Sequence, residues 1–236
     1  MRRAGGGDDR LGLAGGDMTE TGRLPDWPKK LRLVVITERV SELGRDHAAI
    51  AEAALQAGCR AIQLRDKTIS DRAFVEAARD IQVRCLTHGA LFFVNDRVDV
   101  AAALGCGVHL GFNDLTVEMA RKVLGPKAII GYSPESPGEA HQAVSDGADY
   151  LGIGPVYATA TKADAGEPIG PDGLARMCEA GLAPVVAVGG VTMLNIAEVA
   201  RAGACGAAVV SAVSRARDMG AAVEGLLRAL DAAAAR

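Results

Sequence analysis

Five charged side chains have the types and the order needed to bind a phosphorylated molecule. Arg65, Lys67 and Lys162 are cations that suit a polyanion, and Asp96 and Asp114 are carboxylates that follow successive apolar runs. Paired carboxylates without clustered His or Cys suit a hard ion such as Mg²⁺, which retains waters and binds phosphate oxygens. Together these residues favour stabilisation of a departing diphosphate, whose charge grows as its C–O bond breaks.

Both aspartates also have a plainer interpretation as helix caps. Asp96 precedes a helix expected from Arg97, and Asp114 precedes a helix expected after Leu115. Aspartate is a favoured N-cap because its side chain accepts hydrogen bonds from backbone N–H groups of the first turn. Each aspartate alone fits a cap as well as a ligand. The accompanying cations favour the metal interpretation, with Asp96 and Asp114 as the ligands.

A second anion-binding site is predicted near the C-terminus. The run VAVGGV at 186–191 contains Gly190, and the run VVSAV at 209–213 contains Ser211. A glycine lacks Cβ, so its backbone can approach an anion closely. A Gly-Gly pair alone is more often an ordinary turn. If these runs are the last two strands of a barrel, however, the loops after them commonly bind phosphate through backbone N–H groups.

The remaining motifs carry little functional information. His47, His88 and His141 fall in helical stretches and are expected on the surface, whereas His109 ends an apolar run and is expected to be packed and hydrogen-bonded. No Ser–His–Asp arrangement follows from this order. The sequence has neither GxGxxG nor GxxxxGK[ST], which removes the usual dinucleotide and P-loop interpretations.

The composition bounds the classes of protein that remain. The 236 residues are 49% hydrophobic and carry a net charge of −3, which suits one globular domain and argues against a general nucleic-acid coat. No apolar run approaches the roughly 18 residues that cross a bilayer. The five cysteines are widely spaced without a CxxC pair, so we expect buried thiols and no structural zinc. We expect a cytoplasmic protein, since no apolar stretch of a signal peptide follows Arg2 and Arg3.

The chain divides into two regions. Residues 1–30 are rich in Gly and Asp without a sustained period, so we predict a flexible N-terminal arm. Docking of Trp27 on the domain is the alternative, and a poorly ordered tail is favoured over it. Residues 31–236 alternate apolar runs with Ala-rich stretches and are predicted to form the catalytic domain. The predicted strands are 31–36, 61–64, 91–94, 107–110, 128–131, 150–153, 185–188 and 207–210. The predicted helices are 46–56, 71–86, 98–104, 116–123, 138–145, 171–179, 194–201 and 221–233.

A repeated helix-to-strand turn indicates one supersecondary unit used many times. The segments QAGCRAIQL, SDGADYLGI and RAGACGAAVV each place a glycine between a helix end and a buried strand. Continuous apolar strands such as PVVAV fit a parallel sheet that is buried on both faces. Eight strand–helix units favour an α/β fold with a single closed (β/α)₈ barrel, and an open doubly wound sheet is the alternative.

The barrel predicts where the chemistry gathers, because active sites of such barrels lie at the C-terminal ends of the strands. The polar residues and glycines at these positions are therefore the candidates. They are Thr37, Glu38, Gln63, Arg65, Lys67, Asn95, Asp96, His109, Asp114, Ser133, Thr159, Ala160, Thr161, Lys162, Gly189, Gly190 and Ser211.

The segments AIQLRDK, FFVNDRVDVAAALGCGVHLGFNDL, IIGYS, DYLGIGPVYATATKADAGEPIG, PVVAVGGV and GAAVVSAVS together resemble the thiamine phosphate synthase family. The resemblance covers residues 31–214 in the family's order, and the combination of QLRxK, NDxxD, HLGxxD and TxTK is specific. It implies a (β/α)₈ fold and a Mg²⁺-dependent reaction. That reaction joins 4-amino-2-methyl-5-(diphosphooxymethyl)pyrimidine to 4-methyl-5-(2-phosphooxyethyl)thiazole and releases diphosphate.

The resemblance also implies roles for individual residues. Asp96 and Asp114 would bind Mg²⁺, and Arg65, Lys67, Ser133 and Lys162 would be catalytic. The residues implied to contact the pyrimidine diphosphate are Gln63, Leu64, Arg65, Asp66, Lys67, Asn95, Ser133 and Lys162. Those implied to hold the thiazole phosphate are Thr159, Ala160, Thr161, Gly190, Val210 and Ser211.

Some positions depart from the family's pattern. Phe112 stands where the family usually has Gln, so a polar contact from that position is lost. Tyr132 and Pro134 flank Ser133 where smaller residues are commoner, which would reshape the pyrimidine pocket. Glu38 replaces a frequent Asp after the first strand. These departures concern substrate preference more than reaction class.

Two other functions fit parts of the pattern. A thiazole tautomerase-like relative would share the fold but would not be expected to keep QLRxK, both aspartates and TxTK. A non-catalytic barrel that binds a phosphorylated ligand would bind without turnover. The expected partners are small-molecule substrates, with no nucleic acid or membrane and with a homo-oligomer as an open possibility, since no coiled-coil heptad is visible.

Overall fold

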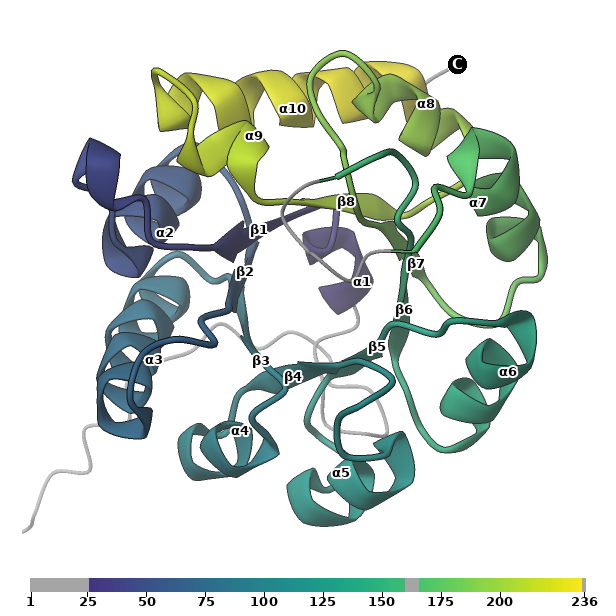
Figure 1. Cartoon of the computed structure of the whole chain (residues 1–236), viewed down its shortest axis with the longest axis horizontal. Helices are drawn as coiled ribbons and strands as arrows, with labels where there is room; N and C mark the ends of the chain where they lie inside the picture. Colours follow the sequence, from purple (N-terminus) through teal and green to yellow (C-terminus); the bar gives the residue numbers. More distant parts are fainter. Residues whose placement is uncertain (1–25, 160–165, 235–236) are drawn as a thin grey trace, which may run out of the picture.

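The computed structural model describes residues 26–159 and 166–234. Within these residues, eight parallel strands close into a barrel in the order β1 to β8, and β8 pairs with β1. Figure 1 shows the ring of strands with the helices outside it. The closure confirms the predicted (β/α)₈ barrel over the open sheet. The strands are β1 (Leu33–Thr37), β2 (Ala61–Leu64), β3 (Leu91–Asn95), β4 (Gly107–Leu110), β5 (Ile130–Tyr132), β6 (Tyr150–Ile153), β7 (Val185–Ala187) and β8 (Gly206–Val209).

Each strand is followed by helical structure that covers the barrel. Polar side chains cap the first turn of several of these helices. Ser70, for example, caps the helix at Asp71–Thr87, where its hydroxyl accepts a hydrogen bond from the N–H of Ala73. The helical elements are α1 (Trp27–Lys30), η1 (Ser41–Leu43), α2 (His47–Gln56), α3 (Asp71–Thr87), α4 (Val98–Leu104), α5 (Val117–Leu124), α6 (Pro137–Ser145), α7 (Gly170–Glu179), α8 (Ile196–Arg201), α9 (Ser211–Ser214) and α10 (Met219–Ala234).

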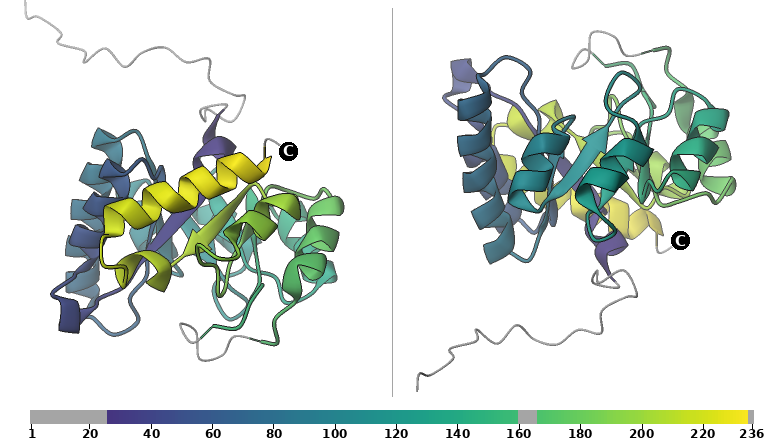
Figure 2. Two further views of the ribbon diagram at one scale, coloured as in Figure 1. Left: turned by 90° about the horizontal axis from the view of Figure 1, so that it is seen from above. Right: turned by 90° about the horizontal axis from the view of Figure 1, so that it is seen from below.

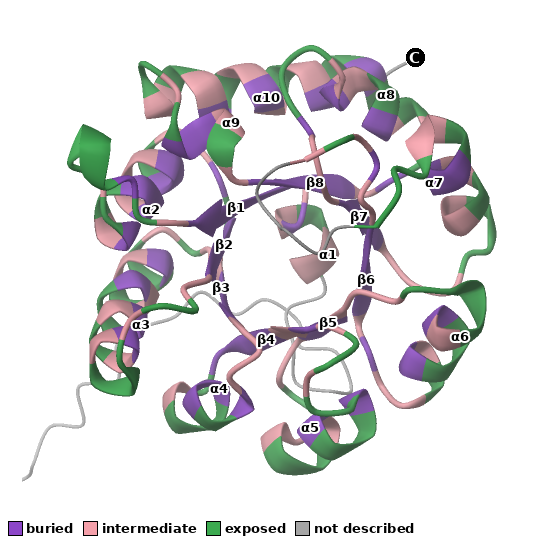
Figure 3. Ribbon diagram, in the orientation of Figure 1, coloured by how far each residue is buried: buried purple, intermediate pink, exposed green. Residues whose placement is uncertain are grey.

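Strand alternation divides the buried side chains into two cores. Leu33 and Val35 of β1 point outward and pack in the larger core between strands and helices. Val34 and Ile36 point inward and pack with Phe93 and other residues inside the barrel. In Figure 3 the strands and the inner faces of the helices are buried, while the outer helix faces are exposed. The inward set therefore forms the floor on which the site is built.

Helix α1 closes the barrel at the N-terminal ends of the strands. Trp27 packs partly buried against the interior core, and Leu31 is fully buried. Figure 1 shows α1 within the outline of the strand ring, and Figure 2 shows it at one end of the barrel. Residues 26–30 of the predicted N-terminal arm form α1 and its N-cap, and the Trp27 ring packs against the interior core. Residues 1–25 lie outside the described residues.

Two further expectations concern the state of the cysteines and the presence of membrane-spanning helices. The five thiols are free, with Cys59, Cys85 and Cys106 buried and Cys178 and Cys205 half-buried. Among the residues that the structure describes, no helix is long and apolar enough to span a bilayer.

Candidate active site

A cavity of about 980 Å³ opens at the C-terminal ends of the strands and extends into the barrel. It lies where the strand-end argument placed the site, and it brings together predicted residues from most of the strands. The predicted residues that line it are Gln63, Arg65, Lys67, Asn95, Asp96, Asp114, Ser133, Thr159, Gly190, Val210 and Ser211. Ala160, Thr161 and Lys162 lie outside the described residues.

Leu64 and Asp66 are the described candidates that do not line the cavity. Leu64 is fully buried in the outer core, and the Asp66 side chain faces the α2 side of the strand, where it contacts His47. Because successive side chains of an extended segment point to opposite faces, Gln63, Arg65 and Lys67 face the cavity while Leu64 and Asp66 face away from it. The segment QLRDK thus supplies alternate side chains to the cavity and to its support.

The support is a buried cluster around Asp66. Its carboxylate accepts hydrogen bonds from the backbone N–H of Thr68 at 2.7 Å and from the ring of His47 at 3.0 Å, and it pairs with Arg39 at 2.9 Å. Burial alone would raise the pKa of Asp66, but hydrogen bonds from Thr68 and His47 and the charge of Arg39 outweigh it and hold that pKa well below its usual range. The cluster therefore fixes the loop that carries Arg65 and Lys67.

The surface expectation for His47 is wrong. His47 is 4% exposed, and its second ring nitrogen lies 2.9 Å from the Thr37 hydroxyl at the end of β1. Buried hydrogen-bonding partners on β1 and on the loop after β2 compensate for the desolvation of the imidazole, which is why a helical histidine can face the core.

Two carboxylates and one cation meet beside this loop. Lys67 Nζ lies 3.1 Å from Asp96 Oδ2. Burial, and then the hydrogen bond and negative charge of Asp114, raise the pKa of Asp96 to about 6, although Lys67 acts in the opposite direction. The two aspartates thus interact directly at the cavity wall. Their charges repel each other, which makes the pair a place where an added cation is favoured.

The helix-cap interpretation of these aspartates fails. The N-cap of α4 is Arg97, with no side-chain hydrogen bond, and the N-cap of α5 is Thr116, whose hydroxyl accepts from the N–H of Met119. Asp96 has a φ of 65°, a left-handed conformation that aspartate adopts more readily than most residues. Asp114 instead accepts a hydrogen bond of 2.7 Å from the N–H of Gly111 in its own loop.

A second polar region faces the same cavity from β6, β7 and β8. Gly190 follows β7 with a φ of +64°, and a Cβ there would lie 2.5 Å from the carbonyl oxygen of Ala158. The backbone of the loop after β6 therefore passes so close to Gly190 that a side chain would not fit there. Val210 and Ser211 follow β8 where the short helix α9 begins. Backbone groups of this kind are suited to an anion.

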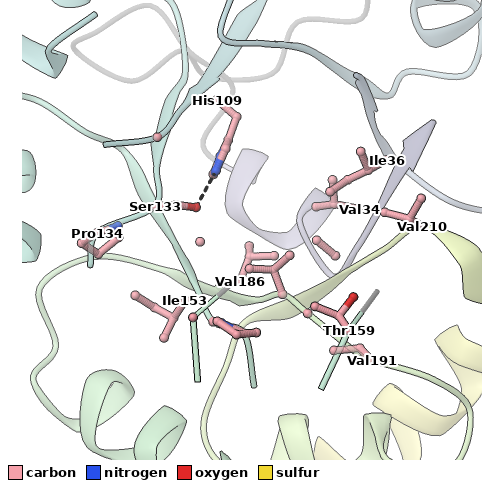
Figure 4. A pocket seen from close by; sticks show the side chains of 18 of the residues that line it. Val34, Ile36, His109, Ser133, Pro134, Ile153, Thr159, Val186, Val191 and Val210 are labelled. Atoms are coloured by element: carbon pink, nitrogen blue, oxygen red, sulfur yellow. Dashed lines mark hydrogen bonds between the residues drawn. The ribbon is translucent and has the colours of Figure 1, made fainter. Parts of the chain in front are cut away.

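The cavity floor is polar on one side and apolar on the other. His109 lies 2.9 Å from the Ser133 hydroxyl and 3.0 Å from that of Tyr150, so the expected packed and hydrogen-bonded histidine is confirmed. Across from them lie apolar side chains such as Val186 and Ile153 (Figure 4). Tyr150 escaped the strand-end argument because it begins β6. The feature that could have identified it is strand alternation, because Tyr150 lies two residues before Gly152 on β6 and so shares its inward face.

The departures from the family's pattern fall at different depths. Phe112 and Pro134 line the cavity, and Phe112 is 56% exposed. Tyr132 instead packs against the outer core, on the other face of β5 from the cavity. Glu38 lines the cavity and accepts a hydrogen bond from the Ser214 hydroxyl, which ties the end of β1 to α9.

Known proteins are similar to this chain in both fold and sequence. A model of the thiamine monophosphate synthase family matches residues 33–213. The thiamine-phosphate synthase of Chloroflexus aurantiacus is 47% identical over 206 residues, 87% of this chain and 93% of that protein. A solved structure of thiamine phosphate pyrophosphorylase from Pyrococcus furiosus has a TM-score of 0.80 at 40% identity, covering 87% of this chain and 98% of that one.

One relative is longer than this chain. The thiamine biosynthesis bifunctional protein ThiM/ThiE of Symbiobacterium thermophilum is 48% identical over 93% of this chain, which spans only 45% of that protein. Residues 33–213, which the family model matches, contain all eight strands and the described cavity residues. The chain belongs to the thiamine monophosphate synthase family.

Proposed function

We propose that this chain is a transferase that joins 4-amino-2-methyl-5-(diphosphooxymethyl)pyrimidine to 4-methyl-5-(2-phosphooxyethyl)thiazole with release of diphosphate. The observation that supports the proposal is one cavity lined by two separate regions that are suited to anions. Arg65 and Lys67 stand beside the two aspartates in one region, and Gly190 and Ser211 form the other. Two phosphorylated substrates need two such regions, and the relatives' names agree with this chemistry.

The first region suits the diphosphate. Within the described part of the chain, no carboxylate pairs with the guanidinium of Arg65, so its charge is available to a ligand. Gln63 donates a hydrogen bond of 2.9 Å to the side-chain oxygen of Asn95. That contact leaves the amino group of Asn95 as a donor for substrate oxygens.

The residues around Asp96 fit Mg²⁺. The donors are carboxylate oxygens, and their mutual repulsion favours a cation. Among the described residues no group of three or more His, Cys, Asp or Glu side chains is placed to hold a metal. Asp96 and Asp114 would therefore hold the ion together with water and substrate oxygens, as Mg²⁺ prefers. When bound, the ion would neutralise charge on the leaving diphosphate.

The second region would anchor the thiazole phosphate. The backbone at Gly190 and the start of α9 at Ser211 would bind its oxygens, with Thr159 alongside them. Between the two regions, apolar side chains such as Val186 and Ile153 provide surfaces for flat rings (Figure 4). Anchoring both phosphates fixes the thiazole nitrogen close to the exocyclic carbon of the pyrimidine.

The bond change then needs no protein nucleophile. The C–O bond to diphosphate breaks, the electron-rich aminopyrimidine stabilises the positive charge left on its methylene carbon, and the thiazole nitrogen attacks that carbon. Arg65 and Lys67, together with Lys162 by resemblance, stabilise the departing diphosphate. Positioning and electrostatics supply most of the rate enhancement.

The direct test is magnesium-dependent diphosphate release. We expect release that requires both substrates together and stops when Mg²⁺ is removed by a chelator. Isomerisation of the thiazole phosphate without diphosphate release would instead indicate a tautomerase. Binding of both compounds without turnover would indicate a ligand-binding barrel, and either result overturns the proposal.

Lys162 gives a sharper test of the leaving-group role. Lys162→Ala is expected to lower kcat about 100-fold, because one charge on the diphosphate is lost in the transition state, and to leave the unfolding transition unchanged. Lys122→Ala is the matched control, since Lys122 is exposed on α5 and its ion-pair partner among the described residues is Glu118. Unchanged kinetics in the Lys162 variant would contradict the assignment.

A further inference from the structure

A hydrogen-bonded chain of three side chains runs through the barrel from its interior to the cavity. Tyr150 on β6, His109 on β4 and Ser133 after β5 belong to three neighbouring strands. The Tyr150 hydroxyl lies 3.0 Å from His109 Nδ1, and His109 Nε2 lies 2.9 Å from Ser133 Oγ. In Figure 4 the His109 ring points to Ser133 at the cavity. The chain thus connects a buried phenol to a residue predicted to touch substrate.

The strands leave a slot for this chain of side chains. A Cβ at Gly131 would lie 2.2 Å from the Tyr150 ring and 2.5 Å from His109 Nδ1. A Cβ at Gly152 would lie 2.8 Å from both the His109 ring and Ser133 Oγ. All of these distances are shorter than side-chain carbons tolerate, so only glycine at these positions of β5 and β6 permits the arrangement. The geometry is therefore specified by several residues rather than by one contact.

Burial sets the direction of the hydrogen bonds. Tyr150 is 2% exposed, and burial raises the pKa of its phenol, so the hydroxyl keeps its proton. Among the described residues, the hydrogen-bond partner of that hydroxyl is His109 Nδ1. A buried O–H group requires an acceptor, so Nδ1 accepts and the ring proton of the neutral imidazole lies on Nε2. That proton is then donated to Ser133 Oγ.

We propose that Tyr150 and His109 are positioning residues that make the Ser133 hydroxyl a hydrogen-bond donor toward the cavity. Because Ser133 Oγ accepts from His109, its own proton points to the ligand. An acceptor atom of the pyrimidine diphosphate is then bound in preference to a donor. This inference rests on the proposed function for the identity of the ligand, but the order of donors and acceptors does not depend on it.

The first experiment tests the order of donors without substrate. NMR of the full chain with ¹⁵N-labelled histidine reports which ring nitrogen carries the proton. We expect His109 with protonated Nε2 and unprotonated Nδ1 in the wild type, with this tautomer lost in Tyr150→Phe. A ring protonated on Nδ1 in the wild type would overturn the inference, whether or not the enzyme is a synthase.

The second experiment is a double-mutant cycle on the reaction. Tyr150→Phe is expected to lower kcat/KM for the pyrimidine diphosphate about tenfold, the effect of weakening one hydrogen bond. KM for the thiazole phosphate should stay within about twofold. In the Ser133→Ala background the same change should have no further effect, because Tyr150 acts through that hydroxyl. Additive losses would show that Tyr150 has only a packing role, and would overturn the inference.

Matched variants separate positioning from packing. Tyr132→Phe removes a phenol oxygen from the other face of the neighbouring strand β5 and should leave kcat/KM unchanged. His109→Gln keeps an N–H group near the place of Nε2 and should retain more activity than His109→Asn, whose amide reaches only toward Tyr150. Equal losses in the two His109 variants, with both folded by circular dichroism, would contradict the proposal. An inactive wild type would overturn the proposed function. The NMR result would then still test the hydrogen-bond order of Tyr150, His109 and Ser133.

Discussion

Folding and cation binding make opposite demands on Asp96. Burial and the neighbouring Asp114 raise the pKa of Asp96 to about 6, so at neutral pH its charge costs free energy in the folded protein relative to the unfolded chain. Asp96→Asn removes that charge. In the presence of a chelator at pH 7 we expect the free energy of unfolding to rise by about 1 kcal/mol. We also expect diphosphate release to fall about 100-fold, because the cation that neutralises the leaving group is lost.

Thermal unfolding with and without Mg²⁺ checks both parts. Mg²⁺ should raise the Tm of the wild type and leave that of the variant unchanged, since an ion stabilises only the state that binds it. Asp231→Asn is the control, because Asp231 is exposed and pairs with Arg32 at the surface. A variant that still responds to Mg²⁺ would contradict the role of Asp96.

The direction in which a side chain points was predictable where the strand register alone decides it. Arg65 and Lys67 face the cavity as the strand-end argument required. The burial of His47 was not predictable, because its partners Thr37 and Asp66 lie 10 and 19 residues away and meet it only when α2 packs against the paired strands β1 and β2. The proton order at His109 likewise depends on a phenol 41 residues distant.

At the scale of elements, the loop after β2 depends on the cluster around Asp66. Asp66→Asn weakens the hydrogen bonds from Thr68 and His47 and the pairing with Arg39. We expect a loss of about 2 kcal/mol of unfolding free energy at pH 7. We also expect a higher KM for the pyrimidine diphosphate, because this loop carries Arg65 and Lys67.

The pH dependence of that loss has a definite sign. Hydrogen bonding holds the pKa of Asp66 below its usual value in the folded state, so its stabilisation is present above the unfolded pKa of about 3.9 and is lost as pH falls. Urea unfolding from pH 7 to pH 3 should therefore show the deficit of Asp66→Asn shrinking below about pH 4. Asp80→Asn, which breaks an exposed pair with Arg84 on α3, should change stability by less than about 0.5 kcal/mol at any pH. A deficit independent of pH would exclude this account.

The conformation of the loop after β7 requires glycine at position 190. Gly190→Ala would bring a Cβ 2.5 Å from the Ala158 carbonyl oxygen at a positive φ, so we expect a loss of about 2–4 kcal/mol of unfolding free energy and a KM for the thiazole phosphate raised at least about tenfold. Gly89→Ala is the matched control, because Gly89 has a φ of +59° with nothing within 4 Å of the added carbon. It should lose only about 1 kcal/mol with KM unchanged. Equal effects of the two changes would argue against crowding at Gly190.

Element boundaries were predictable where apolar runs had clear limits. Strands β2, β4 and β6 coincide with the predicted runs, because glycine or polar residues delimit them. The predicted fifth strand begins at 128, but β5 begins at Ile130, whose backbone N–H donates a hydrogen bond of 2.7 Å to the Asp149 carboxylate. Short helices such as α9 were missed, since four residues give no period.

At the scale of the whole molecule, the count of strand–helix units decided the fold. Closure requires β8 to pair with β1, a contact between residues far apart in sequence that no local pattern contains. It was inferred because eight consecutive units fit a closed barrel better than an open sheet. Closure also explains why one argument placed residues from most of the strands at a single cavity: parallel strands end at the same edge.

The barrel separates stability at one end from chemistry at the other. Trp27 packs against the interior core at the N-terminal end, away from the cavity residues at the strand C-termini. Trp27→Ala is expected to lower the free energy of unfolding by about 2 kcal/mol, or Tm by about 4–8 °C, because a partly buried ring is lost. Trp27→Phe keeps an aromatic ring and should lose less. Both variants should retain the wild-type KM for each substrate at 25 °C, and a raised KM in Trp27→Ala would show that packing at the closed end controls the geometry of the open one.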